Sequence, residues 1–266
     1  MTMIDTTAKA AEILDAIDHR KRLAPFCAIE LPQAYAVVAA MRAKRSARGE
    51  KPIGRKIGFT NRTIWDEYKV FAPIWGYMYE TTLHDISAAR NVELARFVEP
   101  RIEPEIAFGF GRAPQTGMSP AQILDCIDWA AHGFEIVQSH YPEWKFSAPD
   151  TVANNGLHGA YYIGEKVALG EDRAAWLAAL SDFEIALYRN DALVDLGHAR
   201  NVLDGPLFAV AHLLELLASD PHNAPVAAGE IITTGTVTKA WPLAPGERWR
   251  TEVRGLKLPG VEIGFS

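Results

Sequence analysis

The stretch Arg101-Ile-Glu-Pro-Glu-Ile-Ala-Phe108 decides how this chain can fold. Polar and apolar residues alternate through it, as in a β-strand with one polar and one apolar face. Glu103 and Glu105 share the polar face with Arg101 and lie about 7 Å apart at their Cα atoms. If they are partly buried, two carboxylates this close need a cation between them. That cation can be Arg101, a lysine from elsewhere in the chain or a metal ion.

The composition is that of a globular protein. Of the 266 residues, 48% are hydrophobic and 23% are charged, so there is enough chain for a large core. The net charge of -6 argues against a nucleic-acid-binding surface. We expect no membrane span, because even the apolar run 207–218 contains a histidine and a glutamate.

The N-terminus and the cysteines predict a cytoplasmic location. Residues 1–22 lack the basic and then apolar pattern of a signal peptide. The two cysteines, Cys27 and Cys126, form no CxxC motif. Free thiols in a reducing compartment are therefore the simplest interpretation.

The first fifty residues predict a helical N-terminal segment. Apolar residues recur at helical spacing over 6–20, with Thr6 or Thr7 as the N-cap. A second helix is expected over about 31–48, where a glycine and a proline end the pattern. We therefore separate residues 1–50 from the remainder of the chain.

Strands dominate residues 51–266. They are expected at 54–59, 101–108, 134–137, 183–188, 192–196, 230–238, 249–253 and 261–265. Helices are expected over 119–132 and 206–218, and residues 139–160 are expected to form a long ordered loop. This order predicts one α+β unit built around a rolled or sandwiched sheet.

Lys56 lies inside a predicted strand, between Gly54 and Gly58. Its long side chain could snorkel from the strand to water. Close-packed glycine backbone could instead hold the lysine beside an active site. The spacing of the residues leaves both interpretations open.

A third carboxylate, Glu135, lies in the apolar run Phe134–Val137. A carboxylate in such a run is costly unless it is paired or bound to a metal. With Glu103 and Glu105 it offers oxygen ligands without a cysteine or a histidine pair, which favours Mg²⁺ or Mn²⁺ over Zn²⁺. Such a trio could polarise a ketone or chelate a 2-oxo acid. The alternative is a solvent-facing strand on which the glutamates pair with Arg101 and a lysine.

Several short segments occur in one order along the chain, and together they closely resemble the fumarylacetoacetate hydrolase superfamily. They are 54–60, 100–108, 134–137, 150–155 and 229–235. Within the superfamily they are most similar to the branch of 2-keto-4-pentenoate hydratases and 4-oxalocrotonate decarboxylases. The resemblance runs from about residue 10 to the C-terminus, and it implies a mixed β-roll core.

The resemblance also implies a metal site and a substrate class. The metal-binding E-x-E pair and later Glu of the family correspond to Glu103, Glu105 and Glu135, with Mg²⁺ or Mn²⁺ as the cofactor. The active-site lysine of its K-[IV]-G motif corresponds to Lys56, and Gly58 completes that motif. The substrates are 2-hydroxy-dienoates and their 2-oxo tautomers, which would chelate the metal through the C1 carboxylate and the C2 oxygen. Lys56 would be an acid–base group or a carboxylate anchor.

One departure from the branch concerns the acid–base carboxylate. The hydratases resembled usually have an Asp five residues after the glycine that corresponds to Gly76, and here that position is Thr81. Glu80 falls where decarboxylase relatives often have Asp. It is expected either to supply the catalytic carboxylate or to be structural.

A second departure concerns the substrate pocket. The usual A-D-N-A-S reads Ala153-Asn-Asn-Gly-Leu157 here, so Leu157 indicates a more apolar or larger substrate tail. Tyr141, Trp144 and Phe146 either pack the predicted loop or form a substrate wall. Thr234 and Thr236 could meet the substrate carboxylate near Gly235 or be ordinary strand threonines. His158 forms no metal-ligand spacing with another histidine, so we expect no catalytic role for it.

These features together predict a metal-dependent lyase. The expected reaction is hydration of a 2-hydroxy-2,4-dienoate to a 4-hydroxy-2-oxo acid. The alternatives are decarboxylation of a 2-oxo-enedioate, C–C hydrolysis of an acylpyruvate, or a non-catalytic scaffold that partners a related enzyme. The family resemblance also suggests a homo-oligomer.

Overall fold

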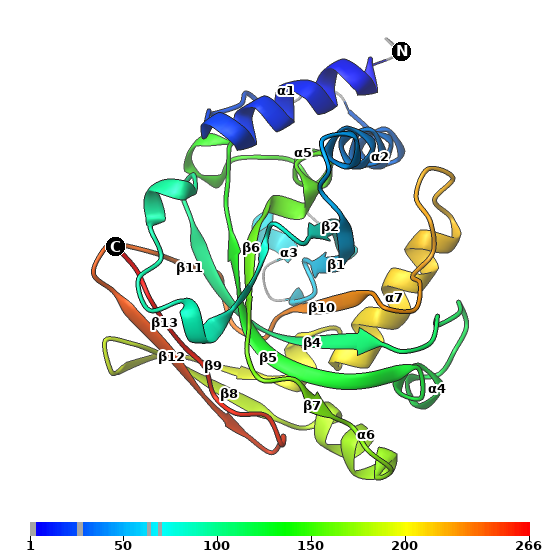
Figure 1. Ribbon diagram of the computed structural model, residues 1–266, viewed down its shortest axis with the longest axis vertical. Helices are drawn as coiled ribbons and strands as arrows, with labels where there is room; N and C mark the ends of the chain where they lie inside the picture. The colour runs from blue at the N-terminus through cyan, green and yellow to red at the C-terminus, as the bar shows by residue number, and fades with distance from the viewer. Residues whose placement is uncertain (1–3, 26–28, 63–64, 69–70) are drawn as a thin grey trace.

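The fold was obtained as a computed structural model that describes residues 4–25, 29–62, 65–68 and 71–266. Cys27 lies outside these residues. In the described part of the chain, a curled nine-stranded sheet and a four-stranded sheet form the β core (Figure 1). The helices α1 and α2 lie together at one end of the molecule, and the four-stranded sheet lies at the other (Figure 1).

The nine-stranded sheet is mixed. Its strand order is β2-β1-β10-β4-β5-β6-β3, with β11 beside β4 and β7 beside β5. Its strands are β1 (Pro52–Gly58), β2 (Ile74–Tyr79), β3 (Leu83–Asp85), β4 (Arg101–Phe110), β5 (Ile127–Val137), β6 (His158–Ile163), β7 (Val167–Ala168), β10 (Ile231–Thr236) and β11 (Trp241–Pro242).

The second sheet closes the other side of the core. Its order is β13-β12-β8-β9, with β8 (Glu184–Arg189), β9 (Ala192–His198), β12 (Arg248–Arg254) and β13 (Glu262–Gly264). One hydrophobic cluster joins the two sheets and contains Ile102, Phe134, Leu187, Trp249 and Ile263. The prediction of an α+β fold with a rolled and sandwiched sheet is therefore confirmed.

Helices surround the sheets. They are α1 (Thr6–His19), α2 (Leu31–Ala47), α3 (Trp65–Tyr68), α4 (Pro120–Leu124), α5 (Ala148–Ala153), α6 (Arg173–Ser181) and α7 (Pro206–Ala218), with short 3₁₀ turns η2 (Ile86–Ala88), η3 (Leu94–Arg96), η4 (Pro142–Trp144), η5 (Asn155–Leu157) and η6 (Ala199–Asn201). The stretch Ala199–Ala218 is long and apolar enough to cross a membrane, but its inner face is buried against the protein, as in a core helix.

The N-terminal helices form close to their predicted bounds. The N-cap of α1 is not Thr6 or Thr7 but Asp5, whose carboxylate accepts hydrogen bonds from two main-chain N–H groups of the first turn. Both helices contribute to the same hydrophobic cluster as the sheet, for example through Ile13 and Val37. The division of the chain after residue 50 stays a prediction.

The helix predicted over 119–132 is wrong in its second half. Only Pro120–Leu124 is helical, and β5 begins at Ile127. The strand is buried on both faces from residue 130 onward, so its sequence is a continuous apolar run without alternation. Such a run cannot be distinguished from a buried helix by periodicity. The predicted loop 139–160 likewise contains α5 and the start of β6.

Candidate metal centre

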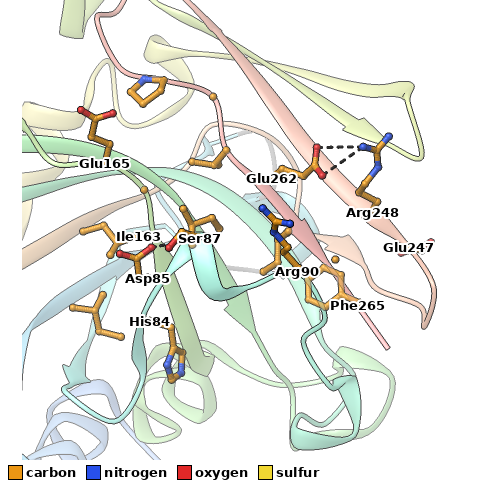
Figure 2. A pocket seen from close by; sticks show the side chains of 18 of the residues that line it. His84, Asp85, Ser87, Arg90, Ile163, Glu165, Glu247, Arg248, Glu262 and Phe265 are labelled. Carbon is orange, nitrogen blue, oxygen red and sulfur yellow. Dashed lines mark hydrogen bonds and ion pairs between the residues drawn. The ribbon is translucent and has the colours of Figure 1, made fainter.

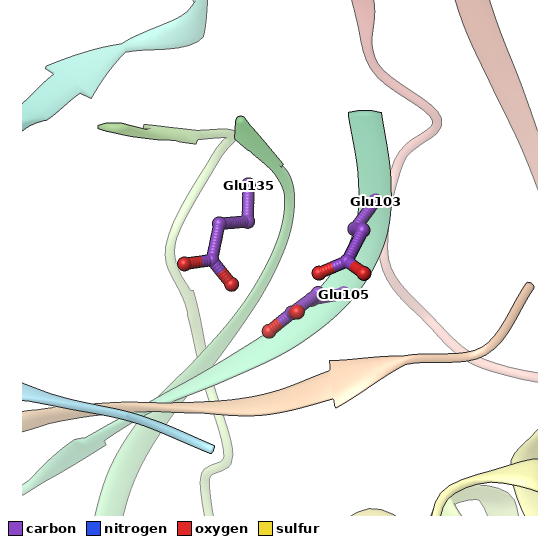
Figure 3. Close-up of side chains that lie close together, drawn as sticks. All are labelled: Glu103, Glu105 and Glu135. Atoms are coloured by element: carbon purple, nitrogen blue, oxygen red, sulfur yellow. The ribbon is translucent and has the colours of Figure 1, made fainter. Parts of the chain in front are cut away.

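The register of the central strands brings the three glutamates together. In the antiparallel pair β4–β5, Glu103 stands directly opposite Glu135. Glu105 lies two residues further along the same face of β4. One oxygen from each carboxylate lies within 4.8 Å of the others, and the three side chains converge in Figure 3.

Burial makes this cluster of negative charge unfavourable by itself. Burial, and then the neighbouring Glu135, raise the pKa of Glu103 to about 7. Burial, and then the charges of Glu135 and Glu103, raise the pKa of Glu105 well above its ordinary value. Gly235 N–H donates to Glu105 Oε2 at 3.0 Å, whereas Glu105 Oε1 is buried without a hydrogen-bond partner among the described residues. A buried acceptor without a partner beside two more carboxylates fits a hard divalent cation.

Lys56 is one cation that faces the cluster. Its Nζ lies 3.2 Å from Glu135 Oε2 and donates to the carbonyl of Gly156 at 3.0 Å. Burial alone would lower the pKa of Lys56, but the charges of the three glutamates outweigh it and raise that pKa. The side chain is buried and does not snorkel to water.

Lys56 and Glu135 hold each other in the charged state. Burial alone would raise the pKa of Glu135, but Lys56, followed by His158, brings it below its ordinary value. One ammonium group cannot neutralise three carboxylates. The cluster therefore carries an excess of negative charge that a further cation would neutralise.

Arg101 does not neutralise the cluster: its charge lowers the pKa of Glu103, but that pKa stays raised. Its guanidinium lies over the ring of Trp144, 4.0 Å from the ring centroid. The alternative of a solvent-facing strand fails as well, because Glu105 and Glu135 are fully buried. Of the three answers that the sequence allowed, the lysine is present and a metal fits.

Glycine backbone packs around Lys56. A Cβ atom added to Gly58 would lie 3.3 Å from Nζ, and one added to Gly156 would lie 3.0 Å from Cδ of the lysine. Gly156 also has a φ of +64°, which favours glycine. The close glycine backbone expected around this lysine is therefore present.

A cavity of about 50 Å³ opens beside Lys56 and Glu103. Its described walls are mostly apolar and include Ile74, Val137, Trp144, Phe146 and Leu157, with Gly58 and Thr236 also lining it. Of the residues that the sequence singled out, Gly58, Leu157, Trp144 and Phe146 thus line this cavity, and Tyr141 is not among its described lining residues. Leu157 adopts a φ of +61°, a conformation that is unusual for a branched side chain.

Two predicted site residues do not reach this cavity. Thr234 is buried, and its hydroxyl donates to the carbonyl of Ile106 at 3.0 Å. Glu80 is exposed in the turn after β2. Thr81, which follows it, donates to Glu50 beside α2. Neither Glu80 nor Thr81 is among the described residues that line the cavity.

A wider groove of about 1340 Å³ lies elsewhere, between β3 and β13 (Figure 2). Its charged side chains include Arg90, Glu165 and Arg248, and Arg248 pairs with Glu262 at 3.3 Å. None of the predicted site residues is among those that line it. Size alone would favour this groove, but the buried unbalanced charge places the candidate site at the smaller cavity.

Sequence reasoning missed His158. The structure places this residue at the start of β6, where its Nδ1 lies 2.8 Å from Glu135 Oε1. The contact crosses from one strand to its neighbour and leaves no spacing signal in the sequence. The position does directly follow the segment 153–157, which departs from the family pattern.

Comparison with known proteins agrees with this geometry. Residues 63–260 match the family model described as fumarylacetoacetate (FAA) hydrolase C-terminal. The chain is 30% identical over 256 residues to a 2-hydroxyhexa-2,4-dienoate hydratase of Comamonas testosteroni, covering 94% of each chain. It is 28% identical over 232 residues to a 4-oxalocrotonate decarboxylase of a Pseudomonas species, covering 86% of this chain and 85% of the relative.

The fold has a solved counterpart along its whole length. The 4-oxalocrotonate decarboxylase from Pseudomonas putida G7, complexed with magnesium and adipate, superimposes with a TM-score of 0.89 at 26% identity. The match covers 100% of this chain and 99% of that one. The resemblance noted in the sequence is confirmed, and the chain belongs to the fumarylacetoacetate hydrolase family.

Proposed function

We propose that this protein is a Mg²⁺- or Mn²⁺-dependent hydratase. It adds water to a 2-hydroxy-2,4-dienoate, through its 2-oxo tautomer, to give a 4-hydroxy-2-oxo acid. The supporting observation is a trio of glutamates, two of them buried and one partly buried, beside a buried lysine; Glu103 and the lysine line a cavity with mostly apolar walls. Relatives named 2-hydroxyhexa-2,4-dienoate hydratase and 2-keto-4-pentenoate hydratase support the same reaction.

Glu103, Glu105 and Glu135 would hold the metal ion. The unpartnered Glu105 Oε1 and the raised pKa of two of the three carboxyl groups fit a hard cation with oxygen ligands. The solved relative complexed with magnesium supports this choice of ion. When bound, such an ion supplies positive charge that stabilises a developing oxyanion on the substrate.

Lys56 would bind and orient the substrate. In metal-free protein the three glutamates raise its pKa, so it is an ammonium group that donates hydrogen bonds. Its Nζ is held by Gly156 and Glu135 at the wall of the cavity, where it can meet a carboxylate or an enolate oxygen. From there it can also donate a proton to the substrate.

The apolar walls favour a substrate with one carboxylate. Among the described residues that line the cavity, Lys56 is the only cation. A second carboxylate on the substrate would face mostly apolar side chains and the neutral Thr60, Asn61 and Thr236, without a second cation among the described lining residues, which is costly. An alkyl tail would bury its surface there. This contrast favours hydration over decarboxylation of an enedioate.

Decarboxylation is the second candidate, because the solved relative is named a 4-oxalocrotonate decarboxylase and its complex contains adipate, a dicarboxylate. Glu80 has no role in the proposed site, because it is exposed and does not line the cavity.

We further propose, from the family resemblance, that the protein forms a homo-oligomer. The buried free thiol of Cys126 supports a cytoplasmic location.

The test is turnover of defined substrates by metal-free protein with and without added Mg²⁺. With 2-hydroxypenta-2,4-dienoate we expect loss of the dienol absorbance and a product heavier by one water. Release of CO₂ from a 2-oxo-enedioate, without hydration of dienoates, would establish the decarboxylase instead. Metal binding without turnover of either class would indicate a scaffold. Cleavage of an acylpyruvate alone would indicate a C–C hydrolase.

A further inference from the structure

The carboxylate of Glu135 is contacted from two sides. Oε2 faces Lys56 Nζ at 3.2 Å, and Oε1 faces His158 Nδ1 at 2.8 Å. All three side chains are almost completely buried. An ionised carboxylate can only accept hydrogen bonds, so His158 donates its Nδ1–H to Glu135.

The other side of the imidazole ring is also held. Nε2 lies 2.9 Å from the hydroxyl of Thr82, a residue in the turn between β2 and β3. That hydroxyl is itself fixed to the end of β2, because it accepts from the main-chain N–H of Tyr79 at 3.2 Å and lies 3.1 Å from the carbonyl of Tyr79, the other acceptor for its single hydrogen. A ring whose hydrogen is on Nδ1 offers Nε2 as an acceptor, and the Thr82 hydroxyl can donate to it. The chain of contacts thus runs from the main chain of β2 to Oε1 of Glu135.

We propose that His158 is a positioning residue for the metal site. By holding Oε1, it directs Oε2 of Glu135 toward Glu103 and Glu105. This inference rests on the proposed function, since it takes Glu135 to be a metal ligand. Partners that orient a ligand in this way reduce the disorder that metal binding would otherwise have to remove.

Lys56 makes this positioning necessary. An ammonium group next to a freely rotating carboxylate attracts both of its oxygens. Without the His158 bond, Glu135 could turn its whole carboxylate toward Lys56 and leave Glu103 and Glu105 without their third ligand. Because His158 donates to Oε1, only Oε2 of Glu135 is left to interact with Lys56 and with a metal ion.

His132 provides a matched control within the same sheet. It lies on β5, is buried, and is also held at both ring nitrogens: Nδ1 by the carbonyl of Glu105 and Nε2 by the hydroxyl of Thr251, each at 2.9 Å. Its contact is with the main chain of Glu105 and not with the carboxylate. A purely structural buried histidine should therefore behave like His132.

The experiment measures binding of Mn²⁺ to metal-free protein by the loss of the free-ion electron paramagnetic resonance signal, so that turnover is not the readout. His158→Gln should weaken the Kd about 10- to 100-fold, the usual cost of removing such a partner. His158→Asn places its amide nitrogen near the position of Nδ1 and should recover most of the affinity. Thr82→Val should weaken the Kd less, about threefold to tenfold, because the ring loses its orientation but not its bond.

The control variant separates this role from general packing. His132→Asn should lower Tm and leave the Kd for Mn²⁺ within about twofold of wild type. Binding of Mn²⁺ by His158→Gln and Thr82→Val as tightly as by wild type would overturn the positioning role. If His158→Gln does not fold, Thr82→Val decides the question alone, since the Thr82 hydroxyl contacts the ring and the main chain of Tyr79 but not the carboxylate of Glu135.

Failure of the proposed site gives a different result. If Glu135→Gln binds Mn²⁺ as tightly as wild type, Glu135 is not a ligand and the proposed metal site is wrong. If Glu135→Gln loses binding while both the His158 and Thr82 variants keep it, the site stands and only the positioning role is refuted.

Discussion

Arg55 and Lys56 are neighbours on β1, and their side chains end in two different kinds of charged environment. Arg55 pairs with one carboxylate, that of Glu230, donates to the carbonyl of Ala224 at 3.0 Å and lies over the ring of Tyr77. Lys56 faces three carboxylates and has one carbonyl as a further partner. Both cations are buried, so burial alone does not separate a structural pair from a functional one.

The balance of charge separates them. Arg55 pairs with one carboxylate and has a second cation, Arg42, close to it over the same aromatic ring, so negative charge is not in excess there. Lys56 faces three carboxylates, and the charge of Arg101 acts on Glu103, so negative charge is in excess and the region takes up protons or a cation. A buried cluster with an excess of negative charge is a better indicator of a metal site than any one of its residues.

The largest expected effect comes from comparing the removal of one carboxylate beside Lys56 with the removal of the carboxylate beside Arg55. Glu135→Gln should abolish binding of Mg²⁺ and lower kcat/KM by about a thousandfold or more, since a bound metal contributes several kcal/mol to such reactions. Glu230→Gln leaves Arg55 unpaired and should lower the free energy of unfolding by about 1–3 kcal/mol. Steady-state kinetics and chemical denaturation measure the two effects. The comparison would break if Glu230→Gln lost metal-dependent activity per folded molecule.

Removing Lys56 should affect activity, whereas removing Arg55 should affect only stability. Lys56→Met should lower kcat/KM by about 10²- to 10⁴-fold, because the substrate loses its hydrogen-bond donor. The Tm of the metal-free variant should also fall, because Glu135 loses the buried cation that lowers its pKa. Arg55→Met should lower Tm and keep kcat/KM close to that of wild type. A Lys56→Met protein that is fully active but unstable would make Lys56 structural, as Arg55 is.

The excess negative charge should also make metal binding depend on pH. Burial raises the pKa of Glu103 to about 7, so this carboxyl group is partly protonated in metal-free protein near neutral pH, and burial also raises the pKa of Glu105 well above its ordinary value. Mg²⁺ requires the ionised form and must displace those protons. Its affinity should therefore rise with pH, by up to about tenfold per unit for each proton displaced, and fall as the pH drops below 7.

Titration calorimetry in two buffers with different ionisation enthalpies counts the protons released when Mg²⁺ binds. We expect a measurable release between pH 6 and 8 and a weaker Kd at the lower pH. Glu230→Gln serves as the control, because it removes a carboxylate outside the trio and should release the same number of protons as wild type. Binding without proton release across this range would mean that the trio is already ionised and that the charge is balanced in another way.

The sequence predicted those parts of the fold and site that depend on one strand at a time. Alternation in 101–108 predicted β4 and the shared face of Glu103 and Glu105. Glu135 was predicted to be paired or bound to a metal because a carboxylate inside an apolar run is costly, even though the start of its strand was predicted to be a helix. In each case the signal is local, since the pattern and the cost both belong to the segment itself.

The errors arise where strands meet. Alternation places Thr234 and Thr236 on one face, but the β10–β4 register shifts between Thr233 and Thr236, and Gly235 has a φ of +90°. Thr236 therefore lines the cavity and Thr234 does not. His158 reaches Glu135 only because β6 lies beside β5. Such contacts depend on tertiary register, which a single sequence does not specify.

The smallest expected effect concerns the cavity beside Lys56. Leu157 lines its apolar wall, so Leu157→Ser should reduce kcat/KM for 2-hydroxyhexa-2,4-dienoate more than for the shorter 2-hydroxypenta-2,4-dienoate. One methyl group in an apolar pocket is worth about 1–3 kcal/mol, so the ratio of the two kcat/KM values should change by about tenfold or somewhat more. The ratio is internally controlled, because a general loss of folded enzyme lowers both values equally. An unchanged ratio would place the substrate tail away from Leu157, and the apolar wall would then no longer distinguish a dienoate from an enedioate.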